Sequence, residues 1–292
     1  MKIKDILLFS VCIFFISLNY ISGKFLSEVP CPAAIVLLRF LISSLLFLPF
    51  VSFSSVKEIT RKDFLLIIVS SFFGVFAYNY LFFMAVKCTL PINISLVNAL
   101  IPFLTLIYSA FIFNTKPTWK EIVLFCMSLI GIVFVITKGN FNLSLFKTFK
   151  GELYMLAGAS CWVFYGFVIR AISKTIPTMT ITFLTGLSGL VFLALFSLVG
   201  NIPLFTIPVL KKSEWLAIAY IGSFGTAGVF FLYNLILKYF TSKKTNLIVF
   251  SSVPITVACI SAALLNQTLN EWQLSGGVLI LASILPMVLQ KD

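Results

Sequence analysis

Residues 64–84 read FLLIIVSSFFGVFAYNYLFFM, a run without one charged side chain. A helix rises about 1.5 Å per residue, so a run of this length can cross the roughly 30 Å apolar core of a bilayer. Inside that core only helices and closed barrels satisfy their backbone hydrogen bonds. The whole chain is similar, with 60% hydrophobic and 10% charged residues and a mean hydropathy of +1.11. This composition predicts an all-α integral membrane protein and excludes a soluble domain.

Ten such stretches, separated by short polar loops, take up most of the chain. The loops are too short to hold a soluble domain, so we expect the function to lie within the membrane. The first stretch is expected to remain as a helix, because no small-x-small cleavage pattern follows it. The ten expected transmembrane helices are Ile6–Phe25, Ala33–Phe53, Phe64–Met84, Leu90–Phe113, Trp119–Thr137, Glu152–Ile172, Thr178–Gly200, Trp215–Leu237, Thr245–Leu265 and Trp272–Leu289.

The net charge of +12 would suggest nucleic acid as a partner of a soluble protein. In a membrane protein the positive-inside rule explains it better. Of the 21 Lys and Arg residues, 13 lie on the side of the N-terminus, 7 on the other side and one, Arg39, within a span. We therefore expect the lipid bilayer and no nucleic acid as partner, with both termini cytoplasmic in the cell (inner) membrane. The loops expected outside surround Glu28, Lys87, Lys147, Lys211 and Glu271.

The second half of the chain repeats landmarks of the first in the same order. Five spans per repeat is an odd number, so the second copy is expected to be inverted relative to the first. Secondary carriers with inverted repeats bind substrate near the midplane, where the halves meet. At offsets of 151 to 152 residues the matched pairs are Gly74 and Gly225, Lys87 and Lys238, Pro102 and Pro254, and Asn114 and Asn266.

Pro102 and Pro254 fall inside the expected fourth and ninth spans. Each removes a backbone donor and would kink its helix, so we predict that both act as hinges. The alternative is that they have no such role, because membrane helices tolerate proline.

A pattern P…(N/E)…W…G closes each half, at Pro102–Gly131 and at Pro254–Gly277. Together with the ten spans, the five-plus-five repeat, Arg39 and Trp162, it makes the chain resemble the drug/metabolite transporter superfamily, EamA type, over essentially its whole length.

The resemblance implies one five-helix repeat in residues 1–140 and a second, inverted one in residues 141–292. It also implies transport of small metabolites, often export, without fixing the cargo. In one respect the chain departs from the family. A glutamate usually follows the fourth and ninth spans there, where this chain has Asn114 and Asn266-Gln267.

The sequence lacks the usual residues for catalysis inside a membrane. It has no histidine, and its acidic residues fall in loops or at span ends, so neither a metal site nor a Ser–His–Asp arrangement is expected. We therefore expect no enzyme activity and no cofactor. Proton relays in membranes use Asp, Glu or His, so direct proton coupling is not expected either. Substrate flux should then follow the substrate gradient. The acidic residues are Asp5, Glu28, Glu58, Asp63, Glu121, Glu152, Glu214, Glu271 and Asp292.

Arg39 is the one clearly embedded charge, about 9 Å into the second span at 1.5 Å per residue. A charge at that depth is costly unless it faces a cavity or a partner, so it favours a functional role. The guanidinium group could bind a carboxylate or phosphate with two hydrogen bonds. Alternatively, Arg39 snorkels to the headgroups or binds carbonyl groups that fix helix packing.

Polar and aromatic side chains within the spans outline a pocket. Asn79 and Phe83 share one face of the third span, and their repeat partners Phe230 and Asn234 share one face of the eighth. Amides and aromatic rings suit a neutral or zwitterionic cargo with an apolar part, although both also bridge packed helices. In the family these spans line the central cavity. The predicted substrate-binding residues are Asn19, Arg39, Tyr78, Asn79, Asn98, Trp162, Tyr165 and Asn234.

The leading hypothesis is a facilitative or exchange carrier that exports small organic metabolites such as amino acids, by alternating access around a midplane cavity. The alternative cargo is a phosphorylated or carboxylated metabolite gripped by Arg39. A membrane scaffold or enzyme is a third hypothesis, which leaves the repeat unexplained. The expected partners are a small-molecule substrate and the lipid bilayer, with the protein a monomer or weak homodimer. Cys31 and Cys88 fall on the same side, so either a disulfide or free thiols fit the sequence.

Overall fold

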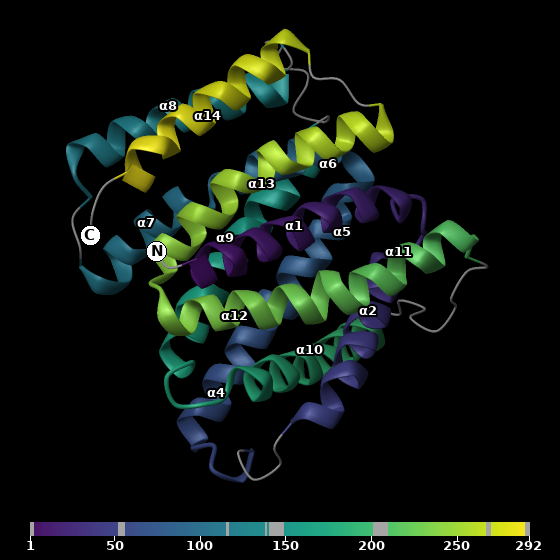
Figure 1. The fold of residues 1–292 in the computed structure, drawn as a ribbon. Coiled ribbons are helices and arrows are strands. Elements are labelled where there is room, and N and C mark those ends of the chain that lie inside the picture. Colours follow the sequence, from purple (N-terminus) through teal and green to yellow (C-terminus); the bar gives the residue numbers. More distant parts are fainter. Residues whose placement is uncertain are drawn as a thin grey trace.

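The computed structural model of this protein describes residues 3–51, 56–114, 117–137, 139, 149–200, 210–266 and 270–289. Lys147, Gln267 and Asp292 lie outside the described residues. Within them every regular element is a helix, which confirms the all-α prediction (Figure 1). The helices of the first half are α1 (Ile3–Phe25), α2 (Pro32–Phe47), η1 (Leu48–Phe50), α4 (Arg61–Ser70), η2 (Ser71–Ala77), α5 (Tyr78–Cys88), α6 (Pro91–Asn98), α7 (Ile101–Phe113) and α8 (Trp119–Thr137).

The second half has a similar series. Its elements are α9 (Lys150–Ile172), α10 (Thr178–Gly200), α11 (Lys212–Gly222), η4 (Ser223–Gly228), α12 (Val229–Tyr239), α13 (Ser242–Leu265) and α14 (Glu271–Leu289).

Within the described residues, eight helical stretches are long and apolar enough to cross a membrane. The protein is therefore a membrane protein with multiple apolar helices. The longest stretches, Arg61–Cys88 and Lys212–Tyr239, have 28 residues each and extend the expected third and eighth spans at both ends. The expected fifth and tenth spans are the 19-residue helices α8 and α14, which are not among the eight. Ten spans thus remain a prediction.

Local sequence signals place several helix ends. Pro32 and Pro91 open α2 and α6, where a residue without a backbone N–H leaves no hydrogen bond unmade. The hydroxyl of Thr60 accepts the N–H of Asp63 at 3.1 Å at the start of α4. Such residues define where each helix begins, so only a few residues are needed between successive helices.

The expected kinks at the two prolines differ from each other. In the fourth span α6 ends at Asn98, and α7 begins at Ile101 with Pro102 in its first turn. The proline therefore starts a new helix instead of kinking a continuous one. Pro254 lies inside α13, which runs without interruption from Ser242 to Leu265. The hinge role of both prolines stays a prediction.

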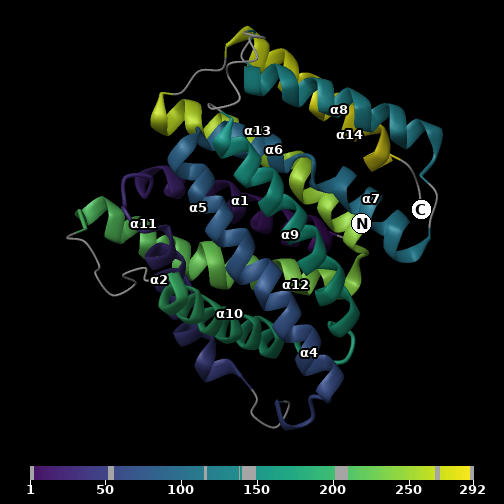
Figure 2. The same ribbon diagram turned by 180° about the vertical axis from the view of Figure 1, so that it is seen from behind.

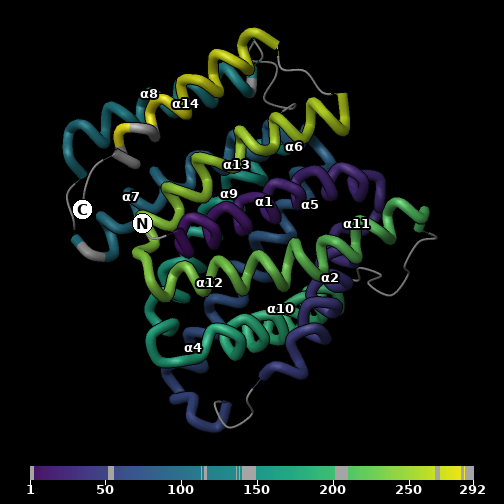
Figure 3. Tube along the Cα trace, in the orientation of Figure 1, coloured from purple at the N-terminus to yellow at the C-terminus, as the bar shows by residue number. Residues whose placement is uncertain are grey.

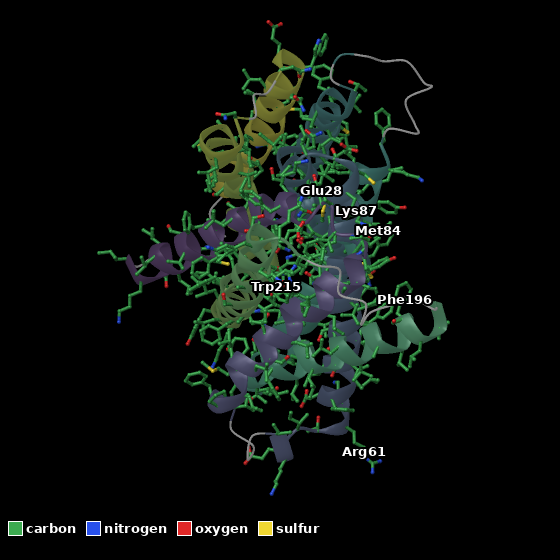
Figure 4. All side chains as sticks on the ribbon, turned by 90° about the vertical axis from the view of Figure 1, so that its right-hand side faces the viewer. Glu28, Arg61, Met84, Lys87, Phe196 and Trp215 are labelled. Carbon is green, nitrogen blue, oxygen red and sulfur yellow. The ribbon has the colours of Figure 1, made fainter. Side chains whose placement is uncertain are left out.

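The helices form a bundle with α8 and α14 paired along one edge and α2, α4 and α10 at the opposite edge (Figures 1 and 2). Helices α1, α9, α12 and α13 lie between these edges. The start of α1 and the end of α14 lie at the same end of the bundle (Figure 1). Figure 4 shows Glu28 close to Lys87 and far from Arg61, which begins the same span as Lys87 at its other end.

Both 28-residue stretches contain a π-helical segment at equivalent positions. Segment η2 begins at Ser71 and η4 at Ser223, an offset that matches the repeat found in the sequence. Figure 3 traces α11, η4 and α12 as one continuous rod, so η4 changes the local winding without ending the helix. Such segments free backbone carbonyl groups from the regular α-helical pattern and often mark functional sites.

Candidate functional site

A small cavity lies at the centre of the bundle, between residues of both halves. Its volume is about 30 Å³, room for about two water molecules. The first half contributes α1, α2 and the third span, and the second half contributes α9, the eighth span and α13. The lining residues are Ile16, Asn19, Tyr20, Arg39, Tyr78, Asn79, Phe82, Trp162, Gly225, Val229, Phe230 and Phe250.

Arg39 is buried in this cavity with only 3% of its surface exposed. Its Nε donates to the Thr226 hydroxyl at 2.7 Å and its Nη2 to the Gly225 carbonyl at 3.3 Å. The guanidinium carbon lies 5.6 Å from the centre of the Phe83 ring, within range of a cation–π contact. The side chain thus faces the bundle interior, and within the described residues no carboxylate pairs with it. A charge held in this way attracts an anionic group.

The π-helical segment η4 supplies the acceptors for Arg39. The Gly225 carbonyl also accepts the Asn19 Nδ2 amide at 2.6 Å, so first-half donors from α1 and α2 meet on one carbonyl of the second half. The Thr226 hydroxyl donates to the Ile221 carbonyl at 2.7 Å, five residues earlier, which follows the π-helical spacing. A side chain at Gly225 would collide with Asn19, so this close approach requires glycine.

Asn19 also has an unused acceptor. Its Oδ1 is buried and has no hydrogen-bond partner among the described residues. A buried polar atom without a partner costs free energy, so this oxygen favours a donor entering the cavity. This oxygen packs against Gly225, whose carbonyl also accepts from Arg39.

Aromatic rings form the remaining wall. The Trp162 ring lies 4.7 Å from that of Tyr78 and 5.5 Å from that of Phe230, measured between centroids. These rings come from α9, α5 and α12, so the wall crosses the interface between the halves. Ring faces accept apolar groups and attract cations such as an ammonium group.

Five of the eight predicted binding residues line the cavity, whereas the other three lie outside its lining. Asn98 donates a hydrogen bond to the Tyr20 hydroxyl, and Tyr20 is itself a lining residue. Tyr165 donates to Asn234 Oδ1 at 2.7 Å, and Asn234 Nδ2 donates to the Thr182 hydroxyl at 3.0 Å. The residues in the lining are Asn19, Arg39, Tyr78, Asn79 and Trp162.

The predicted symmetry between the two amides is only partly present. Asn79 lines the cavity and donates to the Gly74 and Val75 carbonyls at 2.8 and 2.9 Å, in the π-helical segment η2 that precedes it. Its repeat partner Phe230 also lines the cavity, while Asn234 does not. The amide of the first half therefore lines the cavity, whereas the amide of the second half bonds to protein groups outside the lining.

Several lining residues were not predicted from the sequence: Ile16, Tyr20, Phe82, Gly225, Val229 and Phe250. Gly225 had a usable signal, because it is the repeat partner of Gly74 within a polar segment. Tyr20 adjoins the predicted Asn19. Phe250 is one of 33 phenylalanines, and nothing in its local sequence separates it from the others.

Known proteins support this architecture. The model of the EamA-like transporter family matches the chain twice, at residues 3–137 and 149–289. "Uncharacterized transporter YyaM" of Bacillus subtilis (strain 168) is 31% identical over 235 residues, which cover 78% of this chain and 74% of that one. "Uncharacterized transporter YcxC" of the same organism is 24% identical over 195 residues, 65% of this chain and 62% of that one.

A solved structure described only as "Crystal structure of protein" is similar in fold. Its TM-score is 0.68 with 17% identity, and the match covers 99% of this chain and 98% of that one. At this identity the likeness concerns the fold alone. The family match spans nearly the whole chain as two repeats and points to a non-enzymatic membrane transporter. The chain belongs to the EamA-like transporter family, within the drug/metabolite transporter superfamily.

Proposed function

We propose that this transporter carries small organic metabolites that bear a carboxylate, with amino acids as the best fit. Arg39 would bind the carboxylate, the Asn19 Oδ1 would accept a hydrogen bond from the amino group, and the aromatic wall would hold the side chain. The observation that carries the proposal is a buried arginine in the central cavity with no acidic partner among the described residues.

A carboxylate fits this cavity better than a phosphate does. Arg39 is the one charged side chain among the described lining residues, so it balances a single negative charge. A phosphate ester carries more charge at neutral pH and would require further cations. An amino acid adds an ammonium group, which the Asn19 oxygen and the rings of Trp162 and Tyr78 can accept.

The transport mechanism proposed is alternating access between two inverted halves. The cavity is smaller than an amino acid, so the halves would have to separate before cargo could enter. Both halves contribute to its wall, as expected for a site between two repeats. We further propose that both termini lie in the cytoplasm, because basic residues concentrate on the side of the N-terminus. The proposed direction of transport is export across the cell (inner) membrane.

Purified protein in liposomes tests the cargo. We would load unlabelled amino acids and follow counterflow of labelled ones, comparing each amino acid that is carried with its carboxamide, which lacks the negative charge. We expect counterflow of the acid and none of the amide. Equal transport of both would contradict the proposed role of a carboxylate.

Variants of Arg39 test the site itself. A hydrogen bond to a charged group contributes about 1.5–3 kcal/mol, so Arg39→Gln should weaken cargo affinity roughly 10- to 100-fold. Arg39→Lys should restore only part of it, because an ammonium group cannot make the paired contacts of a guanidinium.

The matched control is Arg170→Gln. Arg170 also donates to backbone carbonyls, among them that of Lys238 at 2.9 Å, but it lies outside the cavity. Its loss should leave cargo affinity unchanged. Wild-type affinity in a folded Arg39→Gln variant would show that Arg39 fixes helix packing and does not bind cargo.

A further inference from the structure

Glu152 is a buried carboxylate at one end of the bundle. The sequence places it at the start of the expected sixth span, where contact with water would be ordinary. In the structure it is the third residue of α9 and only 6% exposed, because α5 and α6 pack against this helix (Figure 2). Glu152 thus lies at a span end, as its position in the sequence indicates, but it is almost entirely buried.

One carboxylate oxygen of Glu152 is well bound. The Thr89 hydroxyl donates to Oε1 at 2.6 Å, and the Asn93 amide donates to the same atom at 3.4 Å. The Asn93 Oδ1 in turn accepts the Gln273 Nε2 amide at 2.8 Å. Thr89 and Asn93 belong to the first half, whereas Glu152 and Gln273 belong to the second. This cluster therefore joins the halves at the end where α5 meets α6.

The second carboxylate oxygen has no partner. Oε2 of Glu152 is buried and makes no hydrogen bond within the described residues. No lysine or arginine of the described part forms an ion pair with Glu152. An ionised carboxylate buried in this way has one unsatisfied acceptor atom and, apart from the N-terminus of its own helix, no positive group that pairs with it.

The charged and titratable groups of the surrounding helices do not compensate Glu152. Lys87, at the end of α5, donates to the Pro30 carbonyl at 2.5 Å, and α6 carries no titratable residue. Lys150 and Cys88 are exposed, and Glu271 at the start of α14 has the same charge as Glu152. Tyr154, the remaining titratable group near the start of α9, is half-buried.

A proton fits this site better than a metal cation. A sodium or calcium ion needs several oxygen ligands, but the Asn93 oxygen already accepts Gln273 and the Thr89 hydroxyl already donates to Glu152. A proton needs only the free lone pair of Oε2. Its addition neutralises the charge and leaves Oε1 as the acceptor for Thr89.

We propose that Glu152 is a proton-binding site of this carrier and that its protonation controls the contact between the halves at this end. The carboxylate takes one proton from water at the end of α9 and becomes a neutral carboxylic acid. No other bond forms or breaks. The ionised form binds the Thr89 and Asn93 donors strongly, and the neutral form holds them less strongly. This proposal reverses the expectation, drawn from the sequence, that the chain has no group for proton coupling.

Glu214 provides a matched control. It is the third residue of α11 at the same end of the bundle, and its exposure of 7% is close to that of Glu152. Its Oε2, however, accepts the backbone N–H of Lys211 at 2.6 Å. Glu214 therefore caps its own helix and does not leave the same oxygen free.

Infrared difference spectroscopy of the purified protein in lipid tests proton binding without any cargo. Acidification protonates the exposed carboxylates of every variant, and Glu152 should add a separate carboxylic acid C=O band that is present in the wild type and in Glu214→Gln and lost in Glu152→Gln. Glutamine keeps the size of the side chain and an acceptor for Thr89, so the packing should survive. A band of equal size in Glu152→Gln, or no such band in the wild type, would overturn the proposal.

Thr89→Val provides a second measurement if Glu152→Gln does not fold. The valine removes the donor to Oε1, so the C=O band of protonated Glu152 should move to higher frequency. An unchanged band frequency would assign the band to another group and contradict the proposal.

A third experiment tests whether protonation of Glu152 drives transport. It rests on the proposed function, because it needs a cargo found by counterflow. In liposomes with an imposed proton gradient, the wild type and Glu214→Gln should accumulate that cargo. Glu152→Gln should retain counterflow but lose the gradient-driven accumulation. Accumulation by Glu152→Gln equal to that of the wild type would overturn the coupling role. Failure to find any cargo would instead contradict the proposed function and leave the infrared test in force.

Discussion

At the scale of single residues, two asparagines end helices at equivalent positions of the two halves. Asn114 ends α7 with φ of 51°, and Asn266 ends α13 with φ of 50°. These are left-handed conformations, which cost most residues with a Cβ atom roughly 1–2 kcal/mol but are accessible to asparagine. The two sites are repeat partners, so the same local geometry occurs in both halves.

Substitution at these caps should follow backbone conformation. Asn114→Ala and Asn266→Ala should each destabilise the protein by about 1 kcal/mol, because alanine disfavours the left-handed region. Asn114→Gly and Asn266→Gly should be close to neutral. Thermal unfolding of the purified protein in detergent measures the difference. Alanine variants as stable as the glycine variants would show that the caps do not require this conformation.

At the scale of helices, the closest packing in the described part joins the last helix of each half. Helices α8 and α14 cross at Gly131 and Gly276, where a Cβ atom on Gly131 would lie 2.6 Å from the Gly276 carbonyl oxygen. Small residues let helix backbones approach within a membrane, where lipid gives no hydrophobic drive for association. The crossing therefore depends on the absence of side chains at these two positions.

Two neighbouring glycines of α14 test this dependence. Gly276→Ala should destabilise the protein by roughly 1–3 kcal/mol, because its methyl group would collide with the Gly131 carbonyl. In Gly277→Ala the nearest neighbour of the new methyl is Leu96 Cδ2 at 3.6 Å, an ordinary contact. The melting temperature should fall for the first variant and stay the same or rise for the second. Equal melting temperatures of the two variants would contradict the dependence of the α8–α14 crossing on Gly276.

At the scale of the whole molecule, polar contacts join the halves at both ends of the bundle. Lys243 of α13 pairs with the nearly buried Glu121 of α8 at 2.9 Å. At the other end Lys211 pairs with Glu28 at 3.2 Å, and this partner raises the pKa of Lys211. Both side chains of the second pair are exposed, so water and salt screen it and it contributes little to stability. The Lys243–Glu121 pair is the stronger link.

Cysteine labelling in intact cells tests the orientation of the bundle. In a background without the native cysteines, Glu28→Cys should react with an impermeant maleimide, because its loop is expected to face outward. Lys174→Cys lies in the loop between α9 and α10 and should react only after the cells are lysed. A cysteine tag after Asp292 should behave like Lys174→Cys. Labelling of that tag in intact cells would invert the proposed topology.

The sequence by itself determined the class and the family of this protein. Long uncharged apolar runs such as residues 64–84 indicate membrane spans. Within the bilayer such a run forms a helix, because unpaired backbone N–H and C=O groups are costly there. Arg39 was identified as the embedded charge, since no other Lys or Arg falls well within a span. Five of the predicted binding residues line the cavity for the same reason, because a polar residue deep in an apolar span is most easily accommodated facing inward.

The tertiary structure alone decided which inward-facing residues meet. Tyr165 donates to Asn234, and Asn98 donates to Tyr20, so these three predicted residues, which lie outside the cavity lining, bond to protein groups. The depth of a side chain depends on the helix packed against it and not on its own sequence. The π-helical segments gave no sequence signal, yet they place the Gly225 carbonyl within reach of Asn19 and Arg39. The sequence placed Glu152 at a span end, and only the packing of α5 and α6 over the start of α9 buries it.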